Sequence, residues 1–270
     1  MATKEREQLI LDELDRVGAC TYEDLMRLLN VSSMTVRRAV DQLAKRGEVV
    51  KTLGGIQRAS GVAGLYETTL MSRVMEQRPQ KRAIAELALS LIESGQTVYL
   101  DGSTTCLELA KLIAREREGV TVVSNSVATC LELSKTTRNK VLCIGGECDA
   151  SSMCCGGPQC EKWAQTYFVD KVFVSTKGFL VDEGTFESSV STLRIKQVMA
   201  ERTKEVVLLV DHSKFGQRAL CKVIDVAQIG TVVTDDGTLA RDQTRMKKAG
   251  MLVLVAPMGD GKMNEVTRVA

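Results

Sequence analysis

The segment VYLDGSTTCLELA, residues 98–110, ends an apolar run at an aspartate and passes into a helical pattern through small and hydroxyl residues. These residues are Asp101, Gly102, Ser103, Thr104 and Thr105. Small residues let backbone N–H groups approach an anion, and hydroxyls at a helix N-terminus add donors where the helix dipole favours negative charge. The loop can therefore hold a phosphate, and Asp101 could serve as a catalytic base or as a ligand-holding acceptor.

Similar polar groups follow four later apolar runs of the chain. They are Asn125 and Ser126, Gly145 and Gly146, Lys177, and Asp211 with Lys214. An ordinary strand-to-helix turn explains any one of these loops taken alone. Several such loops converging at one edge of a sheet, two of them with a lysine, favour a pocket for a small phosphorylated sugar or polyol.

Alternating strands and helices from about residue 80 would bring these loops together. The expected strands are QTVYLD, VTVVS, KVLCIGG, KVFVST, EVVLLV, TVVTD and MLVLVAP, with helices such as KRAIAELALSLI and TCLELAKLIARE. Apolar strands without polar alternation, each followed by a helix, indicate a parallel sheet covered on both faces. Ligands of such sheets lie beyond the carboxyl ends of the strands, where the polar loops stand.

Residues 1–58 follow a different pattern, of short helices that end in a hairpin. The apolar stripes are Ile10, Leu14 and Val17, then Leu25, Leu28 and Leu29, then Val36, Ala39, Val40 and Leu43. Gly18 and Gly47 are expected to end the first and third helices, and Ser32 or Ser33 to cap the third. Two β-prone runs surround Gly54-Gly55. This order predicts a winged helix-turn-helix.

The exposed face of the third helix favours DNA as its partner. Residues 34–58 carry six basic and two acidic side chains in a chain whose net charge is only +2. Lys and Arg displace counterions from phosphates, and Arg can donate a bidentate pair to guanine. A basic face on a protein-interaction module is the alternative. The expected DNA contacts are Thr21, Tyr22, Ser32, Ser33, Met34, Thr35, Arg37, Arg38, Gln42, Lys45, Lys51 and Arg58.

The segment YEDLMRLLNVSSMTVRRAVDQLAKRGEVVKTLGGIQ resembles the helix-turn-helix of the DeoR family of bacterial sugar-metabolism regulators. The shared elements are VS..TVRR, the following L...G and the GG of the wing. That family usually has Asp-Leu after the paired arginines, where this chain has Ala39-Val40. The resemblance covers nearly the whole chain.

The second part is similar to the effector domain of the same family, whose fold is related to ribose-5-phosphate isomerase. LDGSTT resembles the family's LDSGTT with Gly and Ser interchanged, and VVSNS, LCIGGE and VDHSKF stand in the expected order. The resemblance implies a pocket built from Asp101, Ser103, Thr104, Thr105, Asn125, Lys196, Asp211 and Lys214.

A sensor is expected here rather than an enzyme. Aldose–ketose isomerisation needs a carboxylate base and a partner for the oxyanion. The isomerases of this fold carry an acidic DGADE segment and a Glu-Lys pair, where this chain has STKGF and RIKQ. Ile195 stands where the Glu would be. Asp101, Asp182, Glu183 and Asp211 remain conceivable bases, so an isomerase with a DNA-binding head is an alternative, but no catalytic residue is assigned.

Nine cysteines raise the further alternative of a metal or redox sensor. Cys148, Cys154, Cys155 and Cys160 are close in sequence but have no paired CxxC spacing, and the single histidine is distant. Reduced, buried thiols are the simpler interpretation. No metal and no cofactor are therefore expected.

The sequence thus predicts three parts: a winged helix-turn-helix (1–58), a linker (59–79) and an α/β effector domain with a mostly parallel sheet (80–270). The charged start MATKEREQ and the lack of a long apolar run indicate a cytoplasmic protein that no membrane holds. The function expected is a repressor of a sugar or polyol operon. It would bind double-stranded operator DNA as a homodimer or homotetramer under control of a phosphorylated sugar. The sequence identifies neither the sugar nor the operator.

Overall fold

The computed structural model describes residues 3–17, 19–46, 48–52, 55–58, 70–188 and 190–258. The chain divides into two compact units, Met1–Tyr66 and Glu67–Ala270. Each unit has a hydrophobic core of its own. In the described ranges, no helix is both long enough and apolar enough to cross a membrane.

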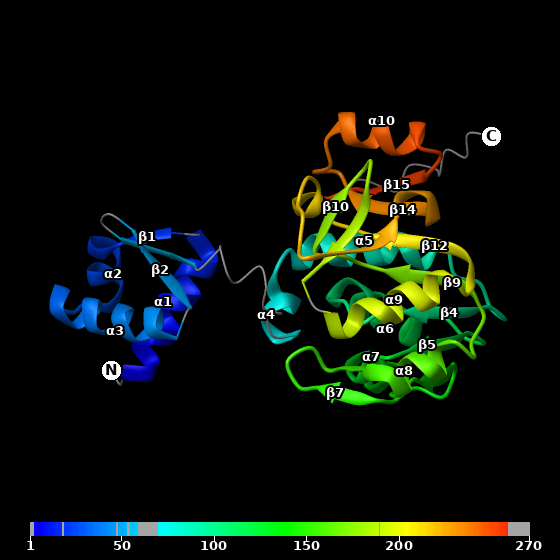
Figure 1. Ribbon diagram of the computed structural model, residues 1–270, viewed down its shortest axis with the longest axis horizontal. Coiled ribbons are helices and arrows are strands. Elements are labelled where there is room, and N and C mark those ends of the chain that lie inside the picture. Colours follow the sequence, from blue (N-terminus) through cyan, green and yellow to red (C-terminus); the bar gives the residue numbers. More distant parts are fainter. Residues whose placement is uncertain are drawn as a thin grey trace. The chain divides into compact units, whose positions relative to one another are not determined.

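The first unit is a three-helix bundle with a small antiparallel sheet (Figure 1). Its elements are α1 (Thr3–Val17), β1 (Ala19–Thr21), α2 (Tyr22–Leu29), α3 (Ser33–Lys45), β2 (Val49–Thr52) and β3 (Gly55–Arg58). The sheet has the order β1-β3-β2, so the predicted wing is present and the predicted winged helix-turn-helix is confirmed. Strand β1 was not predicted. Gly55 permits it, because a Cβ there would meet the backbone oxygen of Cys20 at 2.2 Å.

The predicted apolar stripes form the core of this unit, with one exception. Ile10, Leu14, Leu25 and Leu43 are fully buried, whereas Leu28 is 45% exposed. The inner face of α2 consists instead of Leu25 and Leu29 with Tyr22 and Met26, which pack against the core. The stripe is therefore rotated relative to the predicted one. Gly18, Gly47 and Gly54 lie outside the described residues, as does the side chain of Val17.

The second unit is built on a seven-stranded sheet in which every pair of neighbours is parallel, as predicted. Its order is β15-β14-β12-β9-β4-β5-β6. The strands are β4 (Thr97–Leu100), β5 (Thr121–Ser124), β6 (Lys140–Cys143), β9 (Val169–Val174), β12 (Thr203–Leu209), β14 (Ile229–Asp235) and β15 (Leu252–Ala256).

Helices cover both faces of this sheet (Figure 1). One core cluster joins α5 (Arg78–Leu89) and α6 (Thr104–Glu116) to strand residues such as Leu100 and Phe173. The opposite cluster joins α8 (Gly157–Ala164) and α9 (Val190–Ala200) to Tyr99 and Val172. Burial of alternate residues on opposite faces explains why the strands are continuously apolar. The remaining helices are α7 (Val127–Leu133), α10 (Ala240–Lys248) and the short η1 (His212–Lys214) and η2 (Val226–Gln228).

Two small antiparallel sheets in the second unit were not predicted. One is the hairpin of β7 (Glu147–Asp149) and β8 (Cys154–Gly156). The other has the order β10-β11-β13, with β10 (Gly178–Leu180), β11 (Gly184–Glu187) and β13 (Cys221–Asp225).

The second half of the predicted linker, 59–79, is helical. Helix α4 (Leu70–Met75) lies there, and α5 begins at Arg78. Leu70 is 6% exposed, and its N–H donates to the carbonyl oxygen of Ser151 at 2.8 Å. These residues therefore pack as part of the second unit, while 59–69 lie outside the described residues.

Candidate functional site

The strand order reverses direction between β4 and β9. After β4 the chain proceeds outward to β5 and β6, and after β9 it proceeds the other way to β12, β14 and β15. Loops that diverge at such a point leave a crevice at the carboxyl ends of the strands. A pocket of about 230 Å³ is lined there by the residues that follow β4 and β9. The complete lining is Arg73, Glu76, Lys81, Gly102, Ser103, Thr104, Thr105, Cys154, Ser175, Thr176, Lys177, Glu187, Ser188, Lys196, Asp211 and Lys214.

The N-terminus of α6 forms one wall of the pocket, as the sequence predicts. Ser103 is the N-cap, and its Oγ accepts a hydrogen bond from the N–H of Cys106 at 3.2 Å. Thr104 and Thr105 make the first turn and line the pocket. The free N–H groups of a first helical turn and the helix dipole favour an anion at this position.

Asp101 lies behind this wall and does not line the pocket. It is fully buried, and its carboxylate accepts from the N–H groups of Ser103 (3.0 Å) and Ser175 (3.1 Å). Its Oδ2 lies 2.9 Å from Nζ of Lys196. Burial by itself would raise the pKa of Asp101, but the Lys196 charge and the hydrogen bonds hold this pKa below its ordinary value. Asp101 therefore orders the loop after β4 and ties it to the end of β9.

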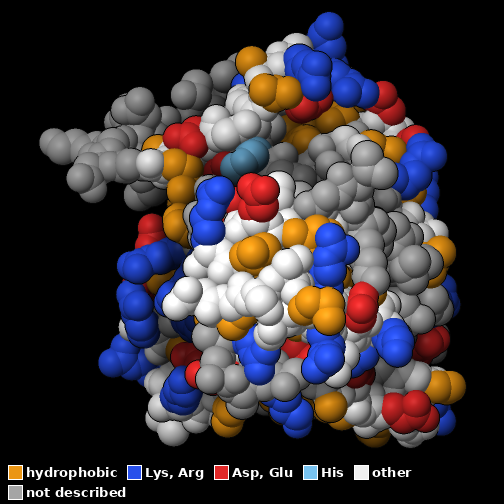
Figure 2. Space-filling view, turned by 90° about the vertical axis from the view of Figure 1, so that its left-hand side faces the viewer, with side chains coloured by type: hydrophobic (Ala, Val, Ile, Leu, Met, Phe, Trp, Pro, Cys, Tyr) orange, Lys and Arg blue, Asp and Glu red, His pale blue; other side chains and the backbone are white. Residues whose placement is uncertain are grey.

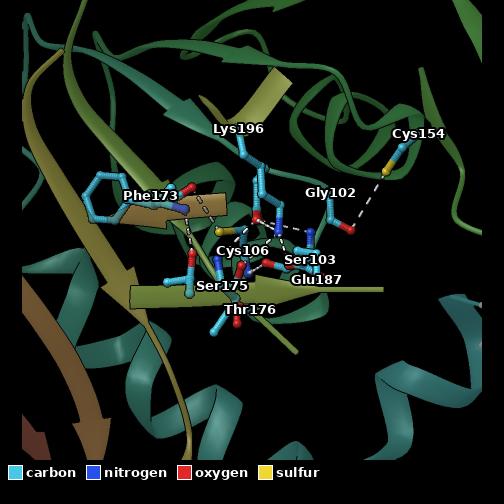
Figure 3. Close-up of polar contacts among 12 residues, drawn as sticks. Gly102, Ser103, Cys106, Cys154, Phe173, Ser175, Thr176, Glu187 and Lys196 are labelled. Atoms are coloured by element: carbon cyan, nitrogen blue, oxygen red, sulfur yellow. Dashed lines mark hydrogen bonds and ion pairs between the residues drawn. The ribbon is translucent and has the colours of Figure 1, made fainter. Parts of the chain in front are cut away.

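Lys196 joins three parts of the site from α9. Its Nζ contacts Asp101, donates to the carbonyl oxygen of Ser175 at 2.8 Å, and lies 2.5 Å from Oε1 of Glu187 (Figure 3). Burial would lower its pKa, but the carboxylates of Asp101 and Glu187 raise it above the ordinary value. Lys196 is thus a permanent cation with its charge shared between two acids.

Lys81, which was not predicted as a site residue, supplies a different kind of cation. Its side chain is 4% exposed, and Nζ donates to the carbonyl oxygen of Arg73 at 2.5 Å. Among the described residues, no carboxylate lies within ion-pair distance of it. Burial lowers its pKa to about 8. Glu76 and Asp211 raise this pKa, but they do not offset burial, so an anion that enters the pocket would stabilise the buried ammonium further.

The remaining wall comes from the ends of β9, β11 and β12. Thr176 holds this part in place, because its Oγ1 contacts the carbonyl oxygens of Gly178 and Phe186 at 3.0 and 2.8 Å. Asp211 caps η1 by accepting from the N–H of Ser213 at 3.0 Å. Ser188 Oγ is buried and, within the described part of the chain, has no hydrogen-bond partner. With Lys177 and Lys214, the lining contains five basic and three acidic side chains.

Four further predicted effector residues, besides Asp101, lie outside the pocket lining. They are Asn125, Ser126, Gly145 and Gly146. Asn125 is buried and accepts from the Tyr99 hydroxyl (2.7 Å), while Ser126 Oγ caps α7. A Cβ at Gly146 would meet Gly156 O at 2.5 Å, so this glycine permits close packing. Structural roles therefore account for Asn125, Ser126 and Gly146.

Two acids considered as bases, Asp182 and Glu183, line a second cavity with His212. Glu187, which was not considered, does line the main pocket, where it is paired with Lys196. In the described part of the chain, no three His, Cys, Asp or Glu side chains are arranged to hold a metal ion.

In the first unit, the outer face of α3 is exposed as predicted. Met34 is 74% exposed, and Arg37, Arg38, Gln42 and Lys45 are also exposed. Lys and Arg side chains are spread among hydrophobic and acidic ones over the face drawn in Figure 2. The side chains of Lys51 and Arg58 lie outside those that the structure describes.

Arg37 is held in position before any partner binds. Its guanidinium lies 4.7 Å from the centre of the Tyr22 ring, and its Nε donates to Ser33 Oγ at 3.4 Å. Thr21 caps α2, so its side chain is engaged with Asp24. Ser32 is the N-cap of α3, but its Oγ meets the hydroxyl of Thr35 and caps no N–H.

Arg6 on α1, which was not predicted, joins the α3 face. With Met34, Thr35, Arg38 and Ala39 it lines a hollow of about 220 Å³. This position could not be predicted from the sequence, because Arg6 precedes α3 by about 30 residues and reaches it only through the packing of α1.

An exposed basic recognition helix on one unit and an anion pocket on the other define a DNA-binding regulator with a ligand-binding domain. Comparison with protein families agrees: residues 6–61 match the DeoR-like helix-turn-helix domain, and residues 76–236 match the DeoR C terminal sensor domain. The chain belongs to the DeoR family of transcriptional regulators.

Relatives match along nearly their whole length. The transcriptional repressor AccR of Agrobacterium fabrum is 28% identical over 256 residues, which are 94% of this chain and 98% of the relative. The regulator GolR of Listeria innocua is 29% identical over 255 residues, 93% of this chain and 98% of the relative. GlpR of Haloferax volcanii is 28% identical over 255 residues, with 94% and 98% covered. A solved D-ribose-5-phosphate isomerase in complex with phospho-erythronic acid matches 52% of this chain and 55% of its own, with 16% identity and a TM-score of 0.40.

Proposed function

We propose that this DeoR-family protein is a repressor that binds operator DNA through α3. It leaves the DNA when a phosphorylated sugar or polyol occupies the pocket at the carboxyl ends of β4 and β9, here named the switch-point pocket. The names of relatives support the first part, because AccR is a transcriptional repressor. The exposed Arg37, Arg38 and Lys45 support DNA as the partner, since such side chains neutralise phosphates and read guanine.

The observation that carries the ligand assignment is the pairing of a helix N-terminus with a buried cation that has, among the described residues, no carboxylate within ion-pair distance. Thr104 and Thr105 offer the first turn of α6, and Lys81 offers its ammonium to the same pocket. Both favour an anion. Ser188 Oγ and Lys214 supply donors for hydroxyl or phosphate oxygens. A volume of about 230 Å³ suits a compact phosphorylated polyol.

Glu187 and Asp211 are carboxylates in this pocket, so turnover has to be measured. Glu187 is engaged by the charge of Lys196, and Asp211 is engaged by η1. A base has to be free to take a proton from the substrate. We therefore assign both acids to ligand binding and to ordering of the site, and no catalytic residue is proposed.

The test is a thermal-shift panel on the full chain with ribose 5-phosphate, fructose 6-phosphate, glucose 6-phosphate and glycerol 3-phosphate. Each unphosphorylated sugar and inorganic phosphate serve as controls. We expect at least one sugar phosphate to raise Tm and to release the protein from its own promoter DNA. Turnover of a panel member without DNA release would support the isomerase alternative instead.

Matched variants separate the two halves of this proposal. Arg38→Ala is expected to weaken the binding of promoter DNA by about 1–3 kcal/mol, which raises the Kd roughly 5- to 150-fold. The rise in Tm caused by the sugar phosphate should not change. Lys214→Ala is expected to reduce the Tm shift caused by the sugar phosphate and to leave the Kd for promoter DNA unchanged. Lys162→Ala, an exposed substitution on α8, should change neither. Unchanged DNA binding by Arg38→Ala would show that α3 does not read the operator.

A further inference from the structure

The hairpin β7–β8 places two thiols directly opposite each other beside the switch-point pocket. Its antiparallel register pairs Cys148 with Cys155. The adjacent residue of β8, Cys154, lines the pocket. Residues that face each other across an antiparallel pair project from the same face of the hairpin. The two thiols therefore share one face and one position along the strands.

The backbone hydrogen bonds show which kind of pair this is. The N–H of Cys155 donates to the carbonyl oxygen of Asn125 at 2.8 Å, and its own carbonyl oxygen accepts from Nδ2 of Asn125 at 2.8 Å. Both backbone groups of Cys155 thus point away from β7, so Cys148 and Cys155 form a non-hydrogen-bonded pair. In such pairs the Cα atoms are about 4.5 Å apart, which is within the range of disulfides.

The two thiols differ in their access to solvent. Cys148 is exposed, whereas Cys155 is 6% exposed and is held by Asn125. Burial and the neighbouring Cys148 raise the pKa of Cys155, which keeps it a thiol at neutral pH. A small oxidant in solution therefore meets Cys148 first, with Cys155 as the nearby partner.

We propose that Cys148 and Cys155 are a modification site that hydrogen peroxide converts to an intramolecular disulfide. In the first step the Cys148 sulfur attacks peroxide, the O–O bond breaks, and a sulfenic acid and one water form. In the second step the Cys155 sulfur attacks the sulfenic sulfur, an S–S bond forms, and a second water leaves with the thiol proton. Two thiols are oxidised and one peroxide is reduced to two waters. This site is independent of the proposed sugar-phosphate function.

A second thiol pair, Cys130 with Cys143, is the rival for the same oxidant. Cys143 is exposed and Cys130 is 8% exposed. Cys130 lies on helix α7, and its Sγ donates to the carbonyl oxygen of Ser124 at 3.7 Å. The Cys130 and Cys143 side chains also contact each other, and burial together with this contact raises the pKa of Cys130. Strand register, however, places Cys148 and Cys155 face to face. The hairpin pair is therefore expected to react in preference.

The test exposes the reduced full chain to stoichiometric hydrogen peroxide, blocks the remaining thiols and maps them by peptide mass spectrometry. We expect a single disulfide between Cys148 and Cys155, two fewer free thiols of the nine, and full recovery with dithiothreitol. A Cys130–Cys143 disulfide, an intermolecular disulfide or unchanged thiols would each overturn the proposal.

The exposed member of the pair gives a variant that should fold. Cys148→Ser is expected to keep its remaining eight thiols free under the same treatment and to melt like the reduced wild type. Cys221→Ser, on strand β13, is the control and should still form the Cys148–Cys155 disulfide. If Cys148→Ser loses two thiols as fast as the control, the hairpin pair is not the site.

Discussion

Gly102 and Cys154 meet at the rim of the pocket with no room between them. A Cβ built on Gly102 would lie 2.0 Å from Sγ of Cys154, and the Cys154 side chain is buried. We expect Gly102→Ala to lower the free energy of unfolding by about 1–3 kcal/mol, because a buried thiol can move little. Urea denaturation of the full chain measures the effect.

Cys154→Ala should rescue this variant, since it removes the Sγ and leaves the nearest Cys154 atom, its Cβ, 3.5 Å away. Gly145→Ala is the control, because a Cβ there has no atom within 4 Å. If the double variant is no more stable than Gly102→Ala, the two residues do not interact in this way.

Loss of Lys196 should cost much stability. Replacement by Met leaves Asp101 and Glu187 without their cation, and breaking a buried pair costs about 3–5 kcal/mol. Lys204→Met is the control. Its Nζ lies 2.8 Å from Asp170 at the surface, and an exposed pair contributes about 0–1 kcal/mol.

The pH dependence of the Lys196→Met penalty follows from two opposite shifts. The lowered pKa of Asp101 gives stability that is present above about 3.9, its unfolded pKa, and is lost as pH falls through the folded value. The raised pKa of Lys196 gives stability that is present below about 10.4 and is lost as pH rises through the folded value. The penalty should therefore be largest near neutral pH and shrink on acidification. A penalty that grows toward acid pH would contradict this account.

Single residues of the site were predictable where a loop position implies them. Ser103, Thr104 and Thr105 follow a strand and start a helix, so their place in the pocket could be read directly. The burial of Lys81 could also have been predicted. It lies three, four and seven residues before Ile84, Ala85 and Ala88, and this spacing places it on the buried face of α5. Asn125 could not be placed, since its engagement with Tyr99 depends on packing across strands.

At the scale of elements, α2 and α3 begin with different caps. Thr21 accepts from the N–H of Asp24, and the carboxylate of Asp24 accepts from the N–H of Thr21. Thr21→Ala should therefore lower stability by about 1 kcal/mol. Ser32→Ala is the matched comparison and should cost less, because Ser32 caps no N–H. Thermal unfolding followed by circular dichroism compares the two, and equal losses would contradict the difference in capping.

The long elements were predictable and the short ones were not. Strands such as β12 are apolar throughout because both faces of the sheet are covered, and this pattern depends only on local sequence. Strands β1, β10 and β11 have three or four residues and pair only when distant segments meet. Helix α4 was missed because its six residues stand between glycine-rich and proline-containing sequence, where turns are the ordinary expectation.

At the scale of the molecule, two separate cores predict two separable responses. In calorimetry, a sugar phosphate at 100 times its Kd should stabilise the second unit by about 2.7 kcal/mol through mass action. Promoter DNA should stabilise the first unit in the same way. In the Arg38→Ala variant, promoter DNA should stabilise the first unit less, while the sugar phosphate should stabilise the second unit as before. Stabilisation of the first unit alone by the sugar phosphate would contradict the assignment of the pocket.

The strand order also sets a sequence of events in folding. Strands β4, β5 and β6 are neighbours both in the chain and in the sheet, whereas β9 pairs with β4 across about 70 residues. Closing so long a loop is slower than pairing consecutive strands. The half-sheet β4–β6 is therefore expected to form first. The pocket becomes complete only when β9 joins β4, so ligand binding during refolding would report this long-range pairing rather than the earlier pairing of β4, β5 and β6.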